Sequence, residues 1–364
     1  MTEELRAQHP YHMYEAIQAQ PEAFAQAVRR NEASAREVAE RLSVAERLFL
    51  VGIGTSFHAA LVGEHFLRGY GGAIAARAWH SFDFTLYGPR LTAKDHVVAL
   101  SHRGTKQYTM KALARAREAG CGTTLITGVQ ADGTPVLADA TLATVAQDPS
   151  SAHTISYTGA LAGLALLASE LGARRTGAPR LALDVLRDDL PAALQRALAT
   201  EPVAADWAHA HVSRRRIWLV GGGPSAITTT EIALKIKETS YLQAEGMSVE
   251  TMLHGPFQCA EADDLFVLIA PAGAAQARVV ELGPMIRAIG ASYVVVSDGT
   301  ASALRAGASG WIDVPAIAEP FTALTCLVPL QLFSYHLALE RGTNPDSFRA
   351  DDPRFARANG LVEL

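Results

Sequence analysis

The sequence predicts an α/β protein with two tandem domains, each a doubly wound parallel sheet flanked by helices. Three observations support this fold class. The chain of 364 residues is long enough for two domains of ordinary size. Continuous apolar runs alternate with helical stretches, which is typical of parallel strands buried on both faces. One arrangement of strand, glycine turn and helix start also occurs twice, which indicates a duplicated unit.

The duplication is visible as three pairs of apolar runs. One pair ends in glycine turns, with RLFLVGIGTS at residues 47–56 and RIWLVGGGPS at residues 216–225. A single spacing of 169 residues relates the members of every pair, which predicts three strands in one register. The aligned positions are Gly52 and Gly221 (221 − 52 = 169), His96 and Leu265 (265 − 96 = 169), and Thr124 and Tyr293 (293 − 124 = 169).

Helical stretches fill much of the remaining chain. Residues 10–45 are predicted to be helical, with a second helix from Ala23 to Leu42. The predicted organisation has three parts. Residues 1–175 hold the N-terminal helices and the first domain, residues 176–210 form a helical connector, and residues 211–364 form the second domain with its charged helix and C-terminal tail.

Composition narrows the class of protein and its compartment. Hydrophobic residues make up 49% and charged residues 19%, which suits a large core, and a net charge of −5 gives no reason to expect nucleic acid. The three cysteines lack CxxC spacing and no HExxH motif occurs, so we expect no disulfide, no metal and a reducing compartment. The polar N-terminus and the lack of an apolar run of membrane-spanning length predict a soluble cytoplasmic protein.

The stretch from residue 231 to 256 carries the densest set of reactive side chains. Glu231, Lys235 and Glu238 fall at i, i+4 and i+7 of a predicted helix, so all three stand on one face. Such a stripe is either a solvated ion-paired surface or the floor of a site, and by itself the surface is the better interpretation. His254 follows in a turn, and carboxylate, ammonium and imidazole together can move protons at neutral pH.

Three loops of the first domain should meet at the carboxyl ends of its strands, where open parallel sheets bind ligands. Residues 52–56 (GIGTS) offer hydroxyls and N–H groups at a helix start, which is an anion site in principle. Their glycine pattern alone is a weak signal, because a tightly packed turn explains it about as often. The other two loops are residues 101–106 (SHRGTK) and residues 150–154 (SSAHT).

The charged helix and the turn after it resemble the SIS (sugar isomerase) superfamily, and within it the isomerase half of glucosamine-6-phosphate synthases. That family carries E-x-x-x-K-x-K-E-x-S-Y, then A-E, then H-G-P. The matching residues here are Glu231, Lys235, Lys237, Glu238, Ser240, Tyr241, Ala244, Glu245, His254, Gly255 and Pro256. The resemblance implies the two-domain SIS fold, a homodimer with shared active sites, and no cofactor.

The resemblance also implies roles for the charged residues in aldose–ketose isomerisation through an enediol. Glu238 is then the base that moves the proton between C1 and C2, and a carboxylate does this well when burial raises its pKa. His254, reaching the site of a neighbouring subunit, opens the sugar ring. Lys235 neutralises charge on the enediolate oxygen, and Glu231 orients Lys235.

In the resembling family the three loops bind the sugar phosphate and the sugar hydroxyls, and here two of them depart from its pattern. The family reads S-x-S-G-x-T, whereas Arg103 and Lys106 replace the second Ser and the Thr, and His153 stands where the family has Ser. Either charged donors strengthen the hold on phosphate, or the anion differs and is a sulfonate or carboxylate. A third interpretation is that Arg103 and Lys106 lie in a solvated loop and bind no ligand. The predicted substrate-binding residues are Gly54, Thr55, Ser56, Ser101, His102, Arg103, Gly104, Thr105, Lys106, Ser151 and His153.

The C-terminal tail departs as well. The family ends in D-x-P-R and a lysine that forms a Schiff base with the ketose, but aligning that motif on residues 351–354 puts Ala358 at the lysine's place. No lysine follows Lys237, so we expect proton transfer without a Schiff base. The glutaminase half of the synthase has no counterpart in these residues, so we expect no use of glutamine. The predicted activity is a phosphosugar isomerase. An amino-sugar-phosphate deaminase or deglycase and a non-catalytic sugar-phosphate sensor are the alternatives.

Overall fold

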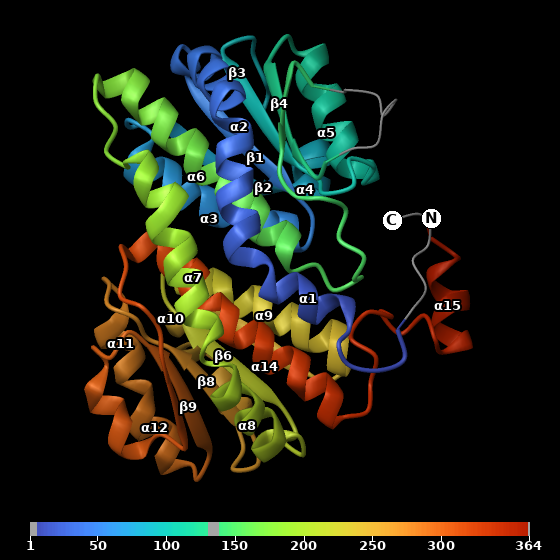
Figure 1. The fold of residues 1–364 in the computed structure, drawn as a ribbon, viewed down its shortest axis with the longest axis vertical. Coiled ribbons are helices and arrows are strands. Elements are labelled where there is room, and N and C mark those ends of the chain that lie inside the picture. Colours follow the sequence, from blue (N-terminus) through green and yellow to red (C-terminus); the bar gives the residue numbers. More distant parts are fainter. Residues whose placement is uncertain (1–5, 130–137, 363–364) are drawn as a thin grey trace. The chain divides into compact units, whose positions relative to one another are not determined.

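The computed structural model describes residues 6–129 and 138–362, which fold into two compact units (Figure 1). The first-sheet unit consists of Ala19–Asp148, His153–Ala192 and Gly360–Leu364. The second-sheet unit consists of Met1–Gln18, Pro149–Ala152 and Ala193–Asn359. The first helix of the chain therefore belongs to the unit of the second sheet.

The first sheet has five parallel strands in the order β2-β1-β3-β4-β5. Alternate residues of its central strands face opposite layers. Phe49, Val51 and Val97 pack with helices α4 and α5, whereas Leu50 lies beside α3 and α6 on the other face. The strands are β1 (Arg47–Gly52), β2 (Ala75–His80), β3 (Asp95–Leu100), β4 (Gly122–Thr127) and β5 (Ala140–Ala143). The helices are α2 (Gln20–Ser43), α3 (Thr55–Tyr70), α4 (Ser81–Tyr87), α5 (Gln107–Glu118) and α6 (Ile155–Thr176).

The second sheet repeats this design in the order β10-β9-β8-β6-β7, again all parallel. Trp218, Phe266 and Val295 face α11 and α12, and the other side is covered by α9, with α14 packed against α9 and α8. The strands are β6 (Ile217–Gly221), β7 (Ala244–Ser248), β8 (Leu265–Ile269), β9 (Ser292–Ser297) and β10 (Gly310–Asp313). The helices are α1 (His12–Gln18), α8 (Glu201–His211), α9 (Pro224–Ser240), α10 (Val249–Leu253), α11 (Gln276–Val280), α12 (Leu282–Ala288), α13 (Thr322–Thr325), α14 (Leu327–Glu340) and α15 (Pro353–Asn359).

The predicted fold class is confirmed, with two adjustments. In the region predicted as a connector, a π-helical turn (Val185–Asp189) leads into α7 (Leu190–Leu198) and then α8. The sheet registers give the third pair of strands an offset of 170 rather than 169, because His96 pairs with Gly122 and Leu265 pairs with Ser292 (292 − 122 = 170). The extra residue lies between the second and third strands of the repeat, in the helical segment, because α5 is one continuous helix of 12 residues, whereas α11 and α12 are separated by Glu281.

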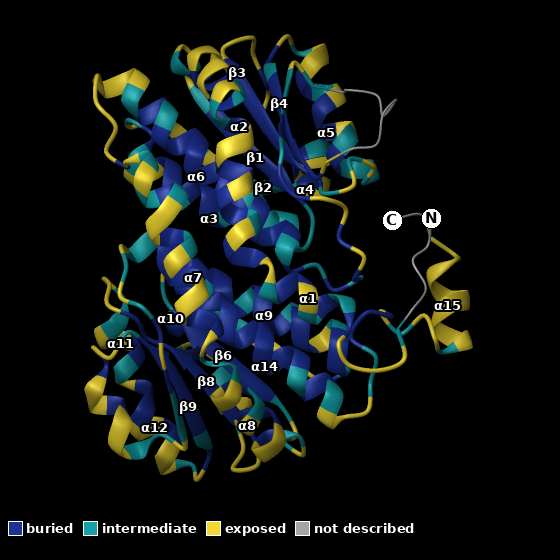
Figure 2. Cartoon of the chain, in the orientation of Figure 1, coloured by how far each residue is buried: buried dark blue, intermediate teal, exposed yellow. Residues whose placement is uncertain are grey.

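Two helical segments correct the expectation about membrane-spanning length. Ile155–Thr176 and Glu319–Glu340 are long and apolar enough to cross a membrane by length and composition alone. They are 83% and 89% buried inside the protein, however, which is the pattern of core helices (Figure 2). Small residues and leucines fill them because both lie against a sheet or another helix along most of their length.

Candidate active site

Helix α9 brings together the three charged residues predicted to share a face. Lys235 Nζ lies 2.5 Å from Glu238 Oε2 and 3.6 Å from Glu231 Oε1. The Glu231 and Lys235 side chains are almost completely buried, whereas 13% of the Glu238 side chain stays accessible. This burial excludes the interpretation of a solvated surface stripe, and it leaves Glu238 as the member of the trio that opens to solvent.

The α9 trio departs from ordinary core composition. Burying a charge is costly unless a partner compensates it, and one ammonium between two carboxylates compensates only part of the negative charge. The helix itself is placed tightly, because a side chain at Gly246 on β7 would meet the Thr229 carbonyl oxygen at 2.1 Å. A costly charged group held on a closely packed helix is the arrangement expected of a functional site.

A cavity lies against the exposed edge of Glu238, within the second-sheet unit. The C-terminal tail contributes four of its lining residues, Phe348, Arg349, Phe355 and Asn359. The others come from α9 and the turn after it, and they are Leu234, Lys237, Glu238, Tyr241, Leu242 and Gln243. The tail therefore covers Glu238 without a lysine.

His254 does not line the Glu238 cavity. Its side chain is 73% exposed at the end of α10, and its Nδ1 lies 2.8 Å from the Glu250 carbonyl oxygen. The Glu250 carboxylate in turn pairs with Arg278, which holds the pKa of that carboxyl below its usual range. Within one chain, the predicted turn therefore leaves the imidazole outside the Glu238 cavity and open to solvent.

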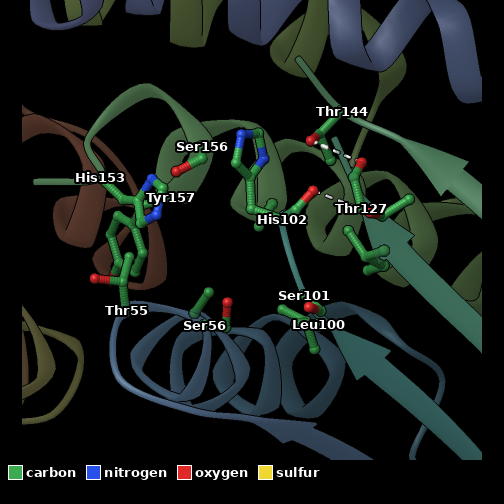
Figure 3. A pocket seen from close by; sticks show the side chains of 13 residues that line it. Thr55, Ser56, Leu100, Ser101, His102, Thr127, Thr144, His153, Ser156 and Tyr157 are labelled. Atoms are coloured by element: carbon green, nitrogen blue, oxygen red, sulfur yellow. Dashed lines mark hydrogen bonds between the residues drawn. The ribbon is translucent and has the colours of Figure 1, made fainter. Parts of the chain in front are cut away.

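A second, smaller cavity lies at the carboxyl ends of the first sheet (Figure 3). Five of the predicted ligand residues line it, namely Thr55, Ser56, Ser101, His102 and His153. Figure 3 shows the His102 and His153 rings side by side over the start of α3, and their centroids are 5.5 Å apart. The remaining lining residues are Ala59, Leu100, Ile126, Thr127, Thr144, Ser156, Tyr157 and Ala160.

His102 has a defined tautomer in this cavity. Its Nε2 accepts a hydrogen bond from the Asp148 backbone N–H at 2.9 Å, so the neutral ring carries its proton on Nδ1. That Nδ1 is buried and has no hydrogen-bond partner among the described residues. Burial, followed by the nearby His153, lowers the pKa of His102 to about 4, so the ring is neutral at physiological pH. The result is a neutral N–H donor without a partner.

Two other groups complete the polar wall of this cavity. Ser101 is 2% exposed, and its hydroxyl also lacks a partner within the described chain. His153 Nδ1 lies 3.7 Å from Oδ2 of the buried Asp148 carboxylate, which also accepts the Thr154 N–H at 3.3 Å. Unsatisfied buried donors are rare in folded proteins, so a ligand presenting acceptor oxygens is the natural partner here.

The two cationic residues of the SHRGTK loop lie outside this cavity. Arg103 is exposed and Lys106 is the half-buried N-cap residue of α5, and neither lines the cavity. Gly104 has a φ of +68°, which only glycine adopts readily, and it shapes the turn that carries Ser101 and His102 inward. Of the remaining predicted residues, Thr105 is exposed and Gly54 is the N-cap of α3, while the Ser151 N–H donates to the Asp346 carbonyl in the second-sheet unit.

Sequence reasoning missed several cavity residues because they follow no local motif. Asp148 does not line the cavity itself, but its backbone N–H bonds His102 from 46 residues away in the sequence, and its carboxylate lies 3.7 Å from His153 Nδ1. Thr127 and Thr144 end neighbouring strands, and Thr144 Oγ1 donates to the Thr127 carbonyl at 3.0 Å. The ends of β4 and β5 were the available signal, since ligand residues gather at the carboxyl ends of parallel strands.

Among residues 6–129 and 138–362, no group of three or more His, Cys, Asp or Glu side chains is placed to hold a metal ion. The three cysteines are free thiols, and Cys121 and Cys326 are buried.

The chain belongs to the SIS domain family, because the family model "SIS domain" matches residues 41–169 and 212–341. These two segments contain the two five-stranded sheets. Within that family, the chain is similar to the isomerase C-terminal domain of glucosamine–fructose-6-phosphate aminotransferase. It is 30% identical over 348 residues to the glutamine–fructose-6-phosphate aminotransferase (isomerizing) of Thermococcus kodakarensis, covering 94% of this chain and 58% of that protein. The chain therefore spans little more than half the length of this relative.

Solved structures show the same fold in several enzymes at low sequence identity. The C-terminal domain of the Francisella tularensis glucosamine–fructose-6-phosphate aminotransferase superimposes with a TM-score of 0.83, at 19% identity and with 93% and 98% of the two chains covered. The tagatose-6-phosphate ketose/aldose isomerase of Escherichia coli gives 0.78, at 19% identity over 96% and 98%. The glucosamine-6-phosphate deaminase of Thermotoga maritima gives 0.72, at 17% identity over 92% and 97%.

Proposed function

We propose that this chain is a phosphosugar aldose–ketose isomerase that works by proton transfer through an enediol. The observation that carries the proposal is the α9 trio, in which buried Lys235 pairs with Glu231 and Glu238 while only Glu238 reaches a cavity. A carboxylate that is accessible on one edge and hydrogen-bonded on the other suits a base that accepts a carbon-bound proton and returns it to the neighbouring carbon.

The other members of the trio would stabilise the intermediate. As Glu238 takes the proton from C2 of the open-chain aldose, negative charge moves onto the sugar oxygen, and the Lys235 ammonium would balance that charge. Glu231, on the opposite side of Lys235, would hold the ammonium in place. The proton on the C2 oxygen would pass to the C1 oxygen, and Glu238 would then return its own proton to C1, which gives the ketose and restores the starting state of the protein.

We further propose that the cavity of the first-sheet unit binds the terminal anion of the sugar and that this anion is phosphate. The Ser101 hydroxyl and the His102 Nδ1–H support this assignment, because both are buried donors without partners. Arg103 and Lys106 would add long-range attraction from outside the cavity. A sulfonate offers the same oxygen geometry and is the alternative anion.

Ring opening is the step for which one chain does not suffice. The exposed position of His254 supports the proposal that it serves the site of a second copy in a cytoplasmic homodimer. Light scattering of the purified protein tests this directly. A monomer whose His254→Asn variant keeps full activity on cyclic sugars would contradict the shared site.

A deaminase or deglycase is the second candidate, because it shares the enolisation step and then releases an amine. The T. maritima deaminase has the same fold, which supports this alternative at the level of fold. A sugar-phosphate sensor is a weaker candidate, because the α9 carboxylate and ammonium are retained here.

A panel of aldose and ketose phosphates, with and without amino groups, separates the three candidates. We expect NMR to show interconversion of an aldose and ketose phosphate pair without added glutamine. Release of ammonia from glucosamine 6-phosphate would place the deaminase first. Binding without turnover across the whole panel would indicate a sensor. Glucosamine 6-phosphate made from fructose 6-phosphate and glutamine by the purified chain would contradict the proposed independence from glutamine.

A further inference from the structure

The cavity beside Glu238 contains two cationic side chains that the proposed isomerisation does not use. Arg349 and Lys237 both line it. Neither makes a side-chain hydrogen bond or an ion pair within the described chain. Among the described lining residues, Glu238 is the only carboxylate, and it is already paired with Lys235. The lining therefore carries one more positive charge than negative.

Arg349 is held in a fixed orientation. Its guanidinium carbon lies 4.7 Å from the centre of the Tyr241 ring and 3.9 Å from the centre of the Phe355 ring. Contacts with two aromatic faces hold the plane of the group, and its N–H donors point outward in that plane. Such a group is prepared for a bidentate bond to a planar carboxylate, because little side-chain freedom is lost when the anion binds.

The tail backbone carries strain at the same place. Phe348 and Arg349 are consecutive non-glycine residues with φ values of +49° and +61°. Such a conformation is unfavourable for a residue with a side chain and persists only where the surroundings enforce it. Just before them, the Asp346 carboxylate accepts the backbone N–H groups of His12 (2.8 Å) and Met13 (2.9 Å). This anchor and the aromatic contacts impose the conformation that brings Arg349 to the cavity.

We propose that Arg349 and Lys237 form a carboxylate-binding subsite beside Glu238. The ligand class is a phosphosugar whose reacting end carries a carboxylate, such as a ketose phosphate joined at C1 to the amino group of an amino acid. A single carboxylate balances the excess positive charge of the lining, whereas a second phosphate would bring extra negative charge close to Glu238. This inference rests on the proposed function, because it takes Glu238 as the side of the cavity where the sugar reacts.

A matched pair of ligands tests the subsite. One is fructose 6-phosphate joined through C1 to glycine, and the other is the same compound made with glycinamide, which lacks only the carboxylate charge. Wild-type protein should bind the glycine compound about 10–100-fold more tightly in calorimetry, the range for a charge-assisted bidentate bond. Arg349→Gln should bring this ratio close to one and leave the affinity for the glycinamide compound unchanged.

Two further variants guard the interpretation. Arg357→Gln is the matched control, because Arg357 is an exposed arginine of the same tail that lies outside the cavity, and it should keep the wild-type ratio. Lys237→Gln should lower the ratio severalfold, and it keeps the test decisive if Arg349→Gln fails to fold.

Equal wild-type affinity for both ligands, or equal losses for both in the variants, would overturn the subsite. If fructose 6-phosphate binds but the carboxylate brings no gain, only the subsite fails. If none of these sugars binds, the proposed function fails with it.

Discussion

The two halves of the chain share a backbone plan and differ in where they place polar chemistry. After its second central strand, the first half reads SHRGTK at residues 101–106, and the second half reads APAGAA at residues 270–275, 169 positions later. Only the glycine is kept, because Gly104 has a φ of +68° and a side chain at Gly273 would collide with the Glu319 carboxylate. Every hydroxyl, imidazole and charge of the first loop is replaced by an alanine or a proline, so the second half keeps the turn and loses its ligand donors.

In the helices that follow the first strand of each half, the polar side chains are instead in the second half. The positions of Glu231, Lys235 and Glu238 on α9 correspond, 169 residues earlier, to Val62, Phe66 and Gly69 on α3. Val62 and Phe66 are fully buried, so the core of this fold accommodates apolar side chains at these positions. The buried charges of α9 are therefore a departure that packing does not require.

The loop of the second half is closed by carboxylates of the same chain. Glu319 Oε1 accepts the Ala274 N–H at 2.9 Å, and the Asp298 carboxylate accepts the Ala272 N–H at 3.1 Å. Gly54 and Gly223 nevertheless start α3 and α9 with the same φ of +55°. The duplicated halves therefore share a scaffold, while buried donors without partners lie at Ser101 and His102 in one half and the buried charged trio lies on α9 in the other.

The largest expected effect is the loss of stability when the charge balance of α9 is broken. Lys235→Met leaves two buried carboxylates without their ammonium, and removing one partner of a buried ion pair costs about 3–5 kcal/mol. Urea denaturation should show this loss of unfolding free energy, and the double change Glu231→Gln with Lys235→Met should recover most of it. If Lys235→Met is as stable as wild type, the buried charges of α9 do not stabilise one another.

Ser101→Ala should weaken binding of a sugar phosphate about 10-fold or more, because it removes a buried donor that the ligand would satisfy. The matched change in the second half is Ala270→Ser, which restores the hydroxyl at the equivalent position and should leave this affinity unchanged. Calorimetric titration measures both. Unaltered affinity in Ser101→Ala would remove the first-sheet cavity from the account.

Acid should destabilise the chain through buried histidines. Burial lowers the pKa of His96, whose Nε2 lies 2.9 Å from Thr124 Oγ1, to about 4. The unfolded state therefore binds a proton between pH 6.5 and 4 that the folded state does not, and stability falls as the pH drops through this window. His96→Gln should reduce the loss between pH 8 and pH 5 by about 2 kcal/mol. An unchanged loss in urea titrations would contradict the assignment.

The smallest expected effect concerns the cations outside the first-sheet cavity. Replacing Arg103 with Ser and Lys106 with Thr should weaken binding of anionic sugars about 2–5-fold, because solvent screens both charges. The effect should shrink as salt is added, and neutral sugars should be unaffected. Equal losses for neutral and anionic sugars would show that the variant damages the fold of the loop rather than its charge.

The sequence predicts the parts of this fold that local pattern controls. The central strands are continuous apolar runs, and the α9 stripe follows from helical periodicity. The edge strands β2, β5, β7 and β10 escaped prediction because they are half-buried and lack a continuous apolar run, as in AEGMS at Ala244–Ser248. Their existence depends on pairing with a central strand rather than on their own composition.

The candidate sites were predictable only in part, for a related reason. The spacing of Glu231, Lys235 and Glu238 identified the trio, but their burial depends on α14 and β7 packing around α9. The tautomer of His102 depends on a backbone N–H 46 residues away. Arg349 was missed because it reaches the Glu238 cavity through the folding of the tail onto Tyr241, about a hundred residues earlier in the chain.

Proton exchange at the sugar tests the central claim most directly, because it reports the proposed role of Glu238 without requiring a finished product. Wild-type protein incubated with its preferred ketose or aldose phosphate in deuterated water should incorporate deuterium at C1 or C2, as seen by NMR. Glu238→Gln should bind the same ligand with unchanged affinity and lose this exchange by about 100-fold or more. Full exchange in Glu238→Gln would contradict the account, and so would a wild-type protein that binds the sugar phosphates but exchanges none of them.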